Sequence, residues 1–298
     1  MKIVFFGTPA IAVTVLEALI GAGETISAVV TVPDKEQGRG KKILPSPVKE
    51  FAVKANIPVF QPEKLRSEEF AEQLRAIQAD LFIVVAFKIL PPHIFDLPRY
   101  GSFNLHGSLL PKYRGAAPIQ WALINGEKTT GLTTFRLAEK VDTGNIYLRT
   151  EVAIQDEDNF GSLYEKMAKA GAKLVLDTVN LIKSGNFRLQ PQDNSLATPA
   201  PKITRETCEI DFYNTALSIH NLVRGLSPYP GAFFIKDGKQ FKIFKTRVVE
   251  KSLKPGEFET TKHKIFAGTG ENSLEILEIQ PEGKRKMTAD EFLRGYIL

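Results

Sequence analysis

The segment from Lys2 to Val32 constrains the fold most, because it has the pattern of a strand, a helix and a second strand. Lys2–Phe6 is an apolar run rich in Val, Ile and Phe, and it ends at Gly7-Thr8-Pro9. From Ala12 apolar residues recur at helical spacing until Gly21. Thr25–Val32 is again apolar and β-branched. Two strands joined through a helix predict a right-handed crossover and a parallel sheet.

The turn Gly7-Thr8-Pro9 is expected to begin the first helix, with Thr8 as the N-cap and Pro9 at the first helical position. A dinucleotide-binding fingerprint needs three spaced glycines, and a phosphate-binding loop needs a Gly-Lys-Ser/Thr ending. The turn has neither, so we do not predict a nucleotide-binding loop here.

Later segments extend the same sheet. Leu81–Phe87 is the most apolar run and is typical of a central strand that is covered on both faces. Gly101–His106 follows as a further strand. Helical patterns at 48–55, 67–77 and 160–182 supply the helices that cover the sheet. The predicted fold class is therefore α/β, with a doubly wound, mostly parallel, Rossmann-like sheet.

A second domain is predicted after a linker. Leu189–Pro201 contains prolines among polar residues and has no periodic apolar face. Beyond it, 215–226 suits one helix, and short strand-like runs follow, with a hairpin signal at Asp237-Gly238. A small OB-like β-barrel is the expected architecture. We predict a catalytic domain over 1–188, a linker over 189–206 and a C-terminal barrel over 207–298.

Length and composition agree with this division. A chain of 298 residues suits two domains that each bury a core. The net charge of +5 permits a polyanionic partner without requiring one. No apolar run approaches the roughly 20 residues of a membrane-spanning helix. The N-terminus lacks the features of a secretory signal, so a cytoplasmic protein is expected.

Cysteine and histidine limit the possible chemistry. Cys208 is the only cysteine, which rules out an intramolecular disulfide and a Cys-based metal cluster, and it is a poor candidate nucleophile. The four histidines, at 93, 106, 220 and 263, are not paired at ligand spacing, so we expect no metal.

Three polar residues suggest a reaction. Asn104 and His106 alternate with apolar residues and therefore share one face at the end of a strand, where ligands of open α/β sheets bind. Asp142 lies in a Val-Asp-Thr-Gly turn. Taken singly, the histidine suits a structural role and the aspartate a turn. Together they suit acyl or one-carbon transfer to an amine: the amide donates to an oxyanion, the imidazole donates or shuttles a proton, and the carboxylate keeps the imidazole protonated.

The segment Pro33–Pro47 is a candidate binding loop. It places Arg39, Lys41 and Lys42 beside glycines and ends in two prolines. An irregular loop of about 15 residues is uncommon inside a compact domain. Two interpretations remain open, a solvated basic loop and a set of cations that becomes ordered against phosphates.

The run Ser108–Pro118 reads Ser-Leu-Leu-Pro-Lys-Tyr-Arg-Gly-Ala-Ala-Pro, with Asn-Leu-His before it and Val-Asp-Thr-Gly after it. This order closely resembles the signature of folate-dependent formyltransferases. The resemblance implies 10-formyltetrahydrofolate as co-substrate, no metal, and Asn104, His106 and Asp142 as catalytic residues. It also implies a folate site formed by Ser108, Leu109, Leu110, Pro111, Phe87, Lys88, Ile89 and Leu90.

Two departures from the family pattern concern the folate site. The family usually has Gly two residues before the catalytic Asp, where this chain has Lys140. Many members have Tyr-Gly where this chain has Phe87-Lys88.

The rest of the chain bears on the acceptor of the formyl group. The purine-pathway member of the family lacks a second domain of this kind. Sugar-nucleotide formyltransferases have a related one but generally lack the loop formed here by Gly38–Lys42 and Pro45–Lys49. That loop is similar to the insertion by which members acting on methionyl-initiator tRNA engage its acceptor end. The resemblance thus implies an enzyme that formylates the α-amino group of this tRNA for translation initiation; the alternative is an amino sugar nucleotide as acceptor. We expect the protein to be a monomer.

On this reading, Arg39 enters the acceptor-stem groove while Lys41 and Lys42 hold phosphates, so binding should depend on salt. In the C-terminal domain, further cations are either contacts to the tRNA backbone or part of a solvated face. These are Lys239, Lys242, Lys245, Arg247, Lys284, Arg285 and Lys286.

Overall fold

The computed structural model describes residues 1–37 and 42–298, which divide into two compact units. The first unit contains 1–115, 131–152 and 164–199, and the second contains 116–130, 153–163 and 200–298. The units are therefore interleaved along the chain. The domain limits drawn from the sequence, at 188 and 207, stay a prediction.

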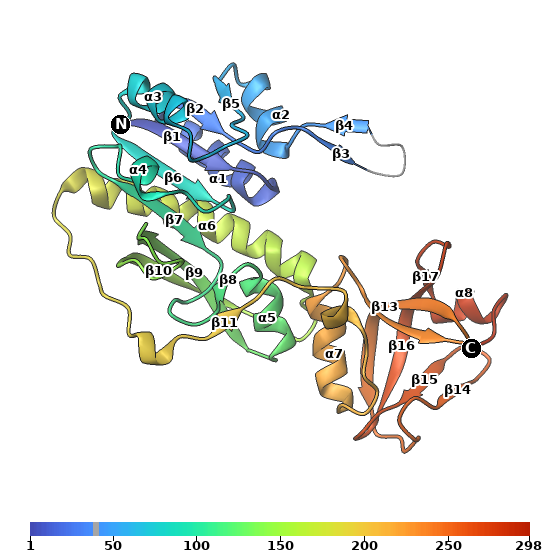
Figure 1. Cartoon of the computed structure of the whole chain (residues 1–298). Helices are drawn as coiled ribbons and strands as arrows, with labels where there is room; N and C mark the ends of the chain where they lie inside the picture. The colour runs from blue at the N-terminus through green and yellow to red at the C-terminus, as the bar shows by residue number, and fades with distance from the viewer. Residues whose placement is uncertain (38–41) are drawn as a thin grey trace. The chain divides into compact units, whose positions relative to one another are not determined.

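The first unit is built on a seven-stranded sheet with the order β10-β9-β7-β6-β1-β2-β5 (Figure 1). Neighbours from β7 to β5 are parallel, and β9 joins β7 antiparallel. The predicted doubly wound, mostly parallel sheet is confirmed. The strands are β1 (Lys2–Gly7), β2 (Thr25–Val30), β5 (Val59–Phe60), β6 (Leu81–Val85), β7 (Ser102–His106), β9 (Thr129–Arg136) and β10 (Ile146–Ala153).

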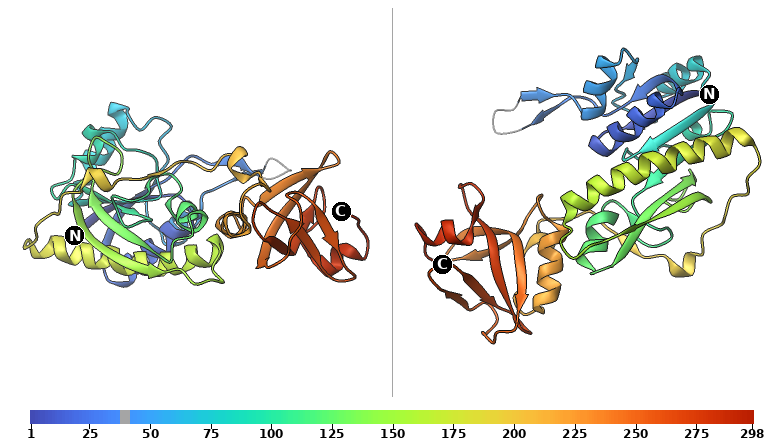
Figure 2. Two further views of the ribbon diagram at one scale, coloured as in Figure 1. Left: turned by 90° about the horizontal axis from the view of Figure 1, so that it is seen from below. Right: turned by 180° about the vertical axis from the view of Figure 1, so that it is seen from behind.

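Helices cover both faces of this sheet. Val4 and Phe6 of β1 pack against residues of α3 (Glu68–Ile77) and α4 (Pro92–Phe95) in one buried cluster. Seen from behind, α1 (Ala10–Gly21) and α6 (Phe160–Ser184) lie over the opposite face (Figure 2). On that face Gly171 of α6 faces Leu105 of β7. Because helices cover both faces of the sheet, all five residues of β6 are buried, and this explains why the strand is apolar throughout.

The start of α1 differs from the sequence prediction. The helix begins at Ala10, and its N-cap is Pro9, in extended backbone and without a side-chain capping bond. Thr8 Oγ1 is buried and has no hydrogen-bond partner in the part of the chain that the structure describes. The prediction of Thr8 as N-cap is therefore wrong, because the extended Pro9 moves the first helical turn one residue further on.

The basic segment contains regular structure that the sequence pattern did not suggest. β3 (Lys35–Gln37) and β4 (Lys42–Leu44) form an antiparallel pair, with Lys35 opposite Leu44. α2 (Pro47–Lys54) follows, with Ser46 as its N-cap. Of the predicted tRNA-binding residues, Arg39 and Lys41 lie outside the described residues, and Lys42 is described only as a backbone position of β4.

The second unit contains an antiparallel half-barrel with the order β12-β13-β16-β15-β14, and β17 pairs with β16. This confirms the predicted β-domain in the form of a half-barrel. Asp237 and Gly238 have φ of 50° and 74°, as a tight hairpin turn between β12 and β13 requires. The strands are β12 (Ala232–Lys236), β13 (Lys239–Val249), β14 (Phe258–Thr260), β15 (Ile265–Gly268), β16 (Ser273–Pro281) and β17 (Met287–Thr288).

The unit also contains the helices α5 (Pro118–Ile124), α7 (Ala216–Gly225) and α8 (Ala289–Leu293). Phe233 and Phe241 of the half-barrel and Phe292 of α8 share one buried cluster with Ile219 of α7. Within residues 1–37 and 42–298, no helix has both the length and the apolar character needed to cross a bilayer.

Candidate active site

His106 ends β7 and is held in one orientation. Its side chain is buried, and Nε2 lies 2.8 Å from the carbonyl oxygen of Tyr113. A carbonyl oxygen only accepts, so Nε2 carries a hydrogen and donates it. The neutral ring therefore has its lone pair at Nδ1, and Nδ1 is the nitrogen left for proton exchange.

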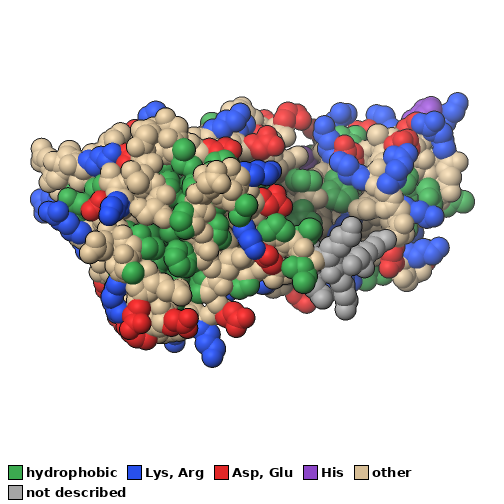
Figure 3. All heavy atoms as spheres, turned by 90° about the horizontal axis from the view of Figure 1, so that it is seen from above, with side chains coloured by type: hydrophobic (Ala, Val, Ile, Leu, Met, Phe, Trp, Pro, Cys, Tyr) green, Lys and Arg blue, Asp and Glu red, His purple; other side chains and the backbone are tan. Residues whose placement is uncertain are grey.

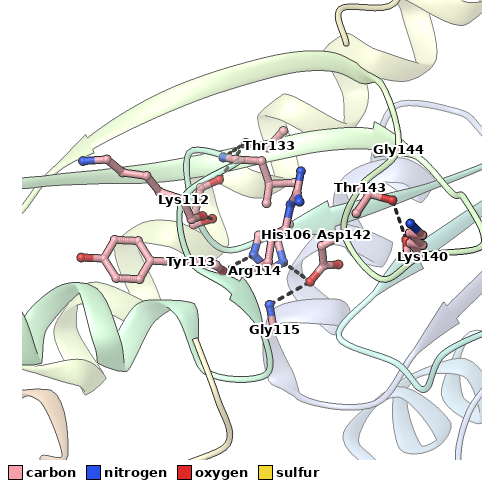
Figure 4. A network of polar contacts seen from close by, with 12 residues as sticks. His106, Lys112, Tyr113, Arg114, Gly115, Thr133, Lys140, Asp142, Thr143 and Gly144 are labelled. Carbon is pink, nitrogen blue, oxygen red and sulfur yellow. Dashed lines mark hydrogen bonds and ion pairs between the residues drawn. The ribbon is translucent and has the colours of Figure 1, made fainter. Parts of the chain in front are cut away.

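Asp142 lies beside that nitrogen, as the sequence predicted (Figure 4). Its Oδ2 is 3.8 Å from His106 Nδ1 and accepts a hydrogen bond of 2.9 Å from the backbone N–H of Gly115. The separation of the two side chains is too long for a direct hydrogen bond but within the distance of an ion pair. Both side chains are largely buried, with 6% and 12% exposed, which strengthens their interaction.

The turn that carries Asp142 depends on its Thr-Gly ending. Asp142 has φ of 54°, a left-handed conformation that Asp tolerates better than most residues. A Cβ at Gly144 would lie 1.7 Å from the carbonyl oxygen of Arg136, so no other residue fits there. Thr143 donates through its hydroxyl to the carbonyl of Lys140, at 2.9 Å. The Val-Asp-Thr-Gly pattern thus has a steric reason as well as a chemical one.

Asn104 lies two positions before His106 on the same strand, so both project to one face. That face is defined by register: Asn104 lies opposite Val84 of β6 and Phe135 of β9. Asn104 is half-buried, and within residues 1–37 and 42–298 its side chain makes no hydrogen bond. Its amide is therefore free to bind a ligand.

The predicted folate residues divide by burial. Ser108, Leu90 and Leu110 are buried. Ser108 Oγ donates to the carbonyl of Lys112 at 2.5 Å, and Leu110 packs with Phe135. Because the side chains of these three residues are buried, we expect them to contact a ligand through their backbones.

The other predicted folate residues have more exposed side chains. Phe87 is half-buried against Phe6, while Lys88 is exposed and Ile89 is 72% exposed. Leu109 and Pro111 are half-buried. Lys140, where the family usually has Gly, is exposed.

The loop Phe87–Leu90 follows β6 at the point where the order of the strands reverses. From β1 the chain goes to β2 on one side, and it later returns to β6 on the other side. Ligands of such sheets bind beyond the carboxyl ends of the strands at this reversal. The exposed apolar side chain of Ile89 suits the flat, partly apolar pterin of a folate, so the residues present fit this co-substrate.

Sequence reasoning missed a set of residues in the predicted linker. Gln192 accepts from the guanidinium of Arg114 and donates to the carbonyls of Asp142 and Gly144. Thr198 accepts from the backbone N–H of Tyr113. These contacts span about 50 to 85 residues of sequence, and the local pattern contains no periodicity that reports them.

Several of the predicted cations in the second unit are paired with acids. Arg247 pairs with Glu275, Lys286 with Glu278 and Arg285 with Glu291, at 3.3, 2.7 and 2.9 Å. Lys242 donates to the carbonyl of Pro230. Figure 3 shows Asp and Glu side chains among the Lys and Arg side chains on one face. These contacts favour the solvated-face interpretation for the paired residues.

The described residues contain no cluster of three or more His, Cys, Asp or Glu side chains that is suited to a metal ion. Cys208 is buried, and its thiol donates to the carbonyl of Thr204. Burial raises the pKa of this thiol, which makes a nucleophilic thiolate still less available.

Comparison with known proteins places the whole chain in one family. Residues 1–179 match the family model described as formyl transferase, and residues 202–297 match the formyl transferase C-terminal domain. A methionyl-tRNA formyltransferase of Thermodesulfovibrio yellowstonii is 48% identical over 98% of this chain and 95% of its own.

Two solved structures share the fold. An N-formyltransferase of Helicobacter canadensis, in complex with folinic acid and dTDP-3-aminofucose, has a TM-score of 0.70 at 21% identity, over 96% of this chain and 100% of its own. HypX of Aquifex aeolicus, in complex with tetrahydrofolic acid, has a TM-score of 0.69 at 18% identity, over 99% of this chain and 48% of its own. Since both family models match and nearly half of the residues are kept over almost the full length of a relative, this chain belongs to the formyl transferase family, within the group of methionyl-tRNA formyltransferases.

Proposed function

We propose that the protein transfers the formyl group of 10-formyltetrahydrofolate to the α-amino group of methionyl-initiator tRNA, for translation initiation. The observation that carries this proposal is the 48% identity to a methionyl-tRNA formyltransferase along nearly the whole of both chains. The site supports it, because the His106–Asp142 pair lies at the end of β7, and Asn104 of the same strand has an amide with no hydrogen bond among the described residues.

In the proposed reaction, the neutral α-amine attacks the formyl carbon and a C–N bond forms. The carbonyl oxygen gains negative charge, and the Asn104 amide and the Nδ1–H of protonated His106 donate to it. The attacking nitrogen loses a proton, the bond from the formyl carbon to N10 breaks, and N10 takes up a proton. The products are formyl-methionyl-tRNA and tetrahydrofolate.

The roles of the two nitrogens of His106 follow from their contacts. Nε2 is committed to the carbonyl of Tyr113, so it anchors the ring. Nδ1 faces Asp142, whose carboxylate stabilises the imidazolium and helps to move the amine proton. Because Gly115 already donates to Asp142 Oδ2, this carboxylate stays fixed while the proton moves.

For the co-substrate, the proposed contacts are the backbone of Ser108–Pro111 and the loop Phe87–Leu90. The co-substrate supplies the activated formyl group when it is bound. Ile89 and Lys88 have the exposed side chains of this set, and so they are the positions where a side chain adds to binding.

For the tRNA, Arg39, Lys41 and Lys42 remain the proposed contacts. The described residues on either side support this, because Lys35–Gln37 and Lys42–Leu44 form an antiparallel pair and Lys49 pairs with Asp34 next to it. The reaction takes place in the cytoplasm, where initiator tRNA is used. The proposed active form is a monomer, since both catalytic side chains and their supports come from one chain.

An assay with parallel acceptors tests the proposal. Methionyl-initiator tRNA and an amino sugar nucleotide are each incubated with 10-formyltetrahydrofolate and the protein, and formylated product is measured. We expect turnover with the charged tRNA only. Turnover with the sugar nucleotide alone would replace the proposed acceptor by the alternative one, and binding of RNA without folate would exclude a formyltransferase.

A further inference from the structure

The segment Gln190–Pro199, here called the strap, is bonded to both halves of the family signature. Gln190 exchanges two backbone hydrogen bonds with Ile146, at 2.8 and 2.9 Å. Further along, the 3₁₀ turn Asn194–Leu196 is followed by β11 (Pro199–Ala200), which pairs with β8 (Arg114–Gly115). The strap therefore starts beside the Asp142 turn and ends beside the segment that follows His106.

Gln192 is the strap residue whose side chain bonds to both halves of the family signature. Its Nε2 donates to the carbonyls of Asp142 and Gly144, at 2.9 and 2.8 Å. Its Oε1 accepts from Nε and a terminal nitrogen of Arg114, at 3.2 and 2.7 Å. The amide thus donates both of its hydrogens to the turn that carries Asp142, and its oxygen accepts from Arg114, the residue before Gly115.

The same strap supports the other side of the pair. Thr198 accepts from the N–H of Tyr113 through its hydroxyl, at 2.9 Å, and from the N–H of Arg114 through its carbonyl, at 2.8 Å. The carbonyl of Tyr113 is the group to which His106 Nε2 donates. Gln192 therefore holds Asp142 directly, and Thr198 holds Tyr113, which in turn holds His106. Together these contacts set the 3.8 Å separation of His106 and Asp142.

We infer that Gln192 is a positioning residue for formyl transfer: its two donated hydrogen bonds hold the Asp142 turn so that the carboxylate faces His106 Nδ1. This inference rests on the proposed function. Loss of the two bonds leaves the carbonyls of Asp142 and Gly144 unpaired and lets the turn move. A displacement of about 1 Å at a catalytic group costs on the order of 100-fold in rate.

Two substitutions separate the donors of Gln192 from its acceptor. Gln192→Glu keeps an oxygen for Arg114 but has no hydrogen for the two carbonyls. Gln192→Leu removes both functions at similar size. We expect both variants to lower kcat by about 10- to 100-fold and to leave KM for folate and for charged tRNA within about threefold. Ser195→Ala is the matched control, because exposed Ser195 bonds only to Asp193 among the described residues, and the kcat of this variant should stay at the wild-type value.

The outcomes distinguish a positioning role of Gln192 from an anchoring role and from a binding role. If Gln192 only anchored Arg114, Gln192→Glu would keep the wild-type kcat, and that result would overturn the inference. A rise in KM without a fall in kcat would also overturn it, because it would mark a binding role. Each variant is assayed well below its own Tm, so that unfolding cannot imitate lost positioning. If the wild-type protein itself fails to formylate methionyl-tRNA, the proposed function fails instead.

Discussion

At the scale of single residues, His106 and Asp142 gain their roles from backbone partners. The carbonyl of Tyr113 fixes Nε2 of the imidazole, and the N–H of Gly115 fixes the carboxylate. Both partners lie in the run that follows His106, so this run positions the pair as well as containing proposed folate contacts. A pair held from both sides needs little rearrangement when charge develops on the substrate.

Removing either member of the pair should slow transfer without abolishing binding. For His106→Ala and for Asp142→Asn we expect kcat to fall by about 10²- to 10⁴-fold, because proton transfer and oxyanion stabilisation are lost. The Kd for tetrahydrofolate, measured by calorimetry, should change by less than about threefold if the effect lies in the transition state. Near-wild-type kcat in either variant would remove that residue from the mechanism.

At the scale of elements, the base of the β3–β4 hairpin is closed by a polar network. Lys49 of α2 pairs with Asp34, just before β3, at 2.6 Å, and Gln61 donates to the same carboxylate. The hydroxyls of Thr31 and Ser46 are 2.7 Å apart. The hydrogen bonds from Lys49 and Gln61 lower the pKa of Asp34, so this network persists at neutral pH. Its position suits the anchoring of a segment that binds a large substrate.

Breaking the Lys49–Asp34 ion pair should raise KM for methionyl-tRNA more than KM for folate. For Lys49→Met we expect KM for methionyl-tRNA to rise by about three- to tenfold, by analogy with the loss of a few ordered phosphate contacts, while KM for folate stays unchanged. Lys54→Met is the control, because it removes the same charge from an exposed position at the other end of α2. Equal effects of the two substitutions would show that only net charge matters.

Helix α7 carries a histidine, His220, whose lowered pKa predicts a stability that depends on pH. Burial lowers the pKa of His220 from its usual 6.5; Arg224 lowers it further, and Glu157, Asp156 and the bond to Thr246 act in the opposite direction. The unfolded chain thus binds the proton at a higher pH than the folded one. Stability should therefore fall as the pH drops through about 6.5 and level off below the folded pKa.

The test compares urea unfolding at about pH 8 and about pH 5.5. In the wild type, the midpoint should be lower at the acidic pH, and in His220→Gln this difference should shrink. His93→Gln, at an exposed position of α4, is the control and should keep the wild-type difference. An unchanged pH difference in His220→Gln would contradict the assignment.

At the scale of the whole molecule, charge is mixed rather than concentrated. The net charge is +5, yet several cations of the half-barrel are neutralised by Glu275, Glu278 and Glu291. These paired cations therefore do not explain selection of a tRNA. In the proposed function, selection depends on Arg39, Lys41 and Lys42.

This view predicts a limited salt dependence. If three phosphates are contacted, KM for methionyl-tRNA should rise by about 10- to 100-fold between about 50 and about 200 mM salt, whereas KM for folate should stay nearly flat. In Arg39→Ala the slope of log KM against log salt should be smaller by about one contact. An unchanged slope in this variant would assign tRNA binding to other residues.

The amino-acid sequence by itself determined the longer elements and the reaction class. Apolar runs such as Leu81–Val85 and helical stripes such as that of α6 follow from local periodicity, and the predicted sheet and half-barrel are confirmed. Asn104, His106 and Asp142 could be proposed as catalytic residues because strand alternation and the family signature are local features of the sequence. Short elements such as β17 and the β3–β4 pair were missed, since two or three residues are too few to show a period.

Only the tertiary structure decided how the site is held. That Nε2 rather than Nδ1 of His106 is anchored, and that Asp142 depends on Gln192, follows from contacts between segments far apart in sequence. The same is true of the cations paired with Glu275 and Glu278. Hydrogen bonds and ion pairs of this kind depend on where the folded chain brings polar groups together, and local propensity contains no record of that.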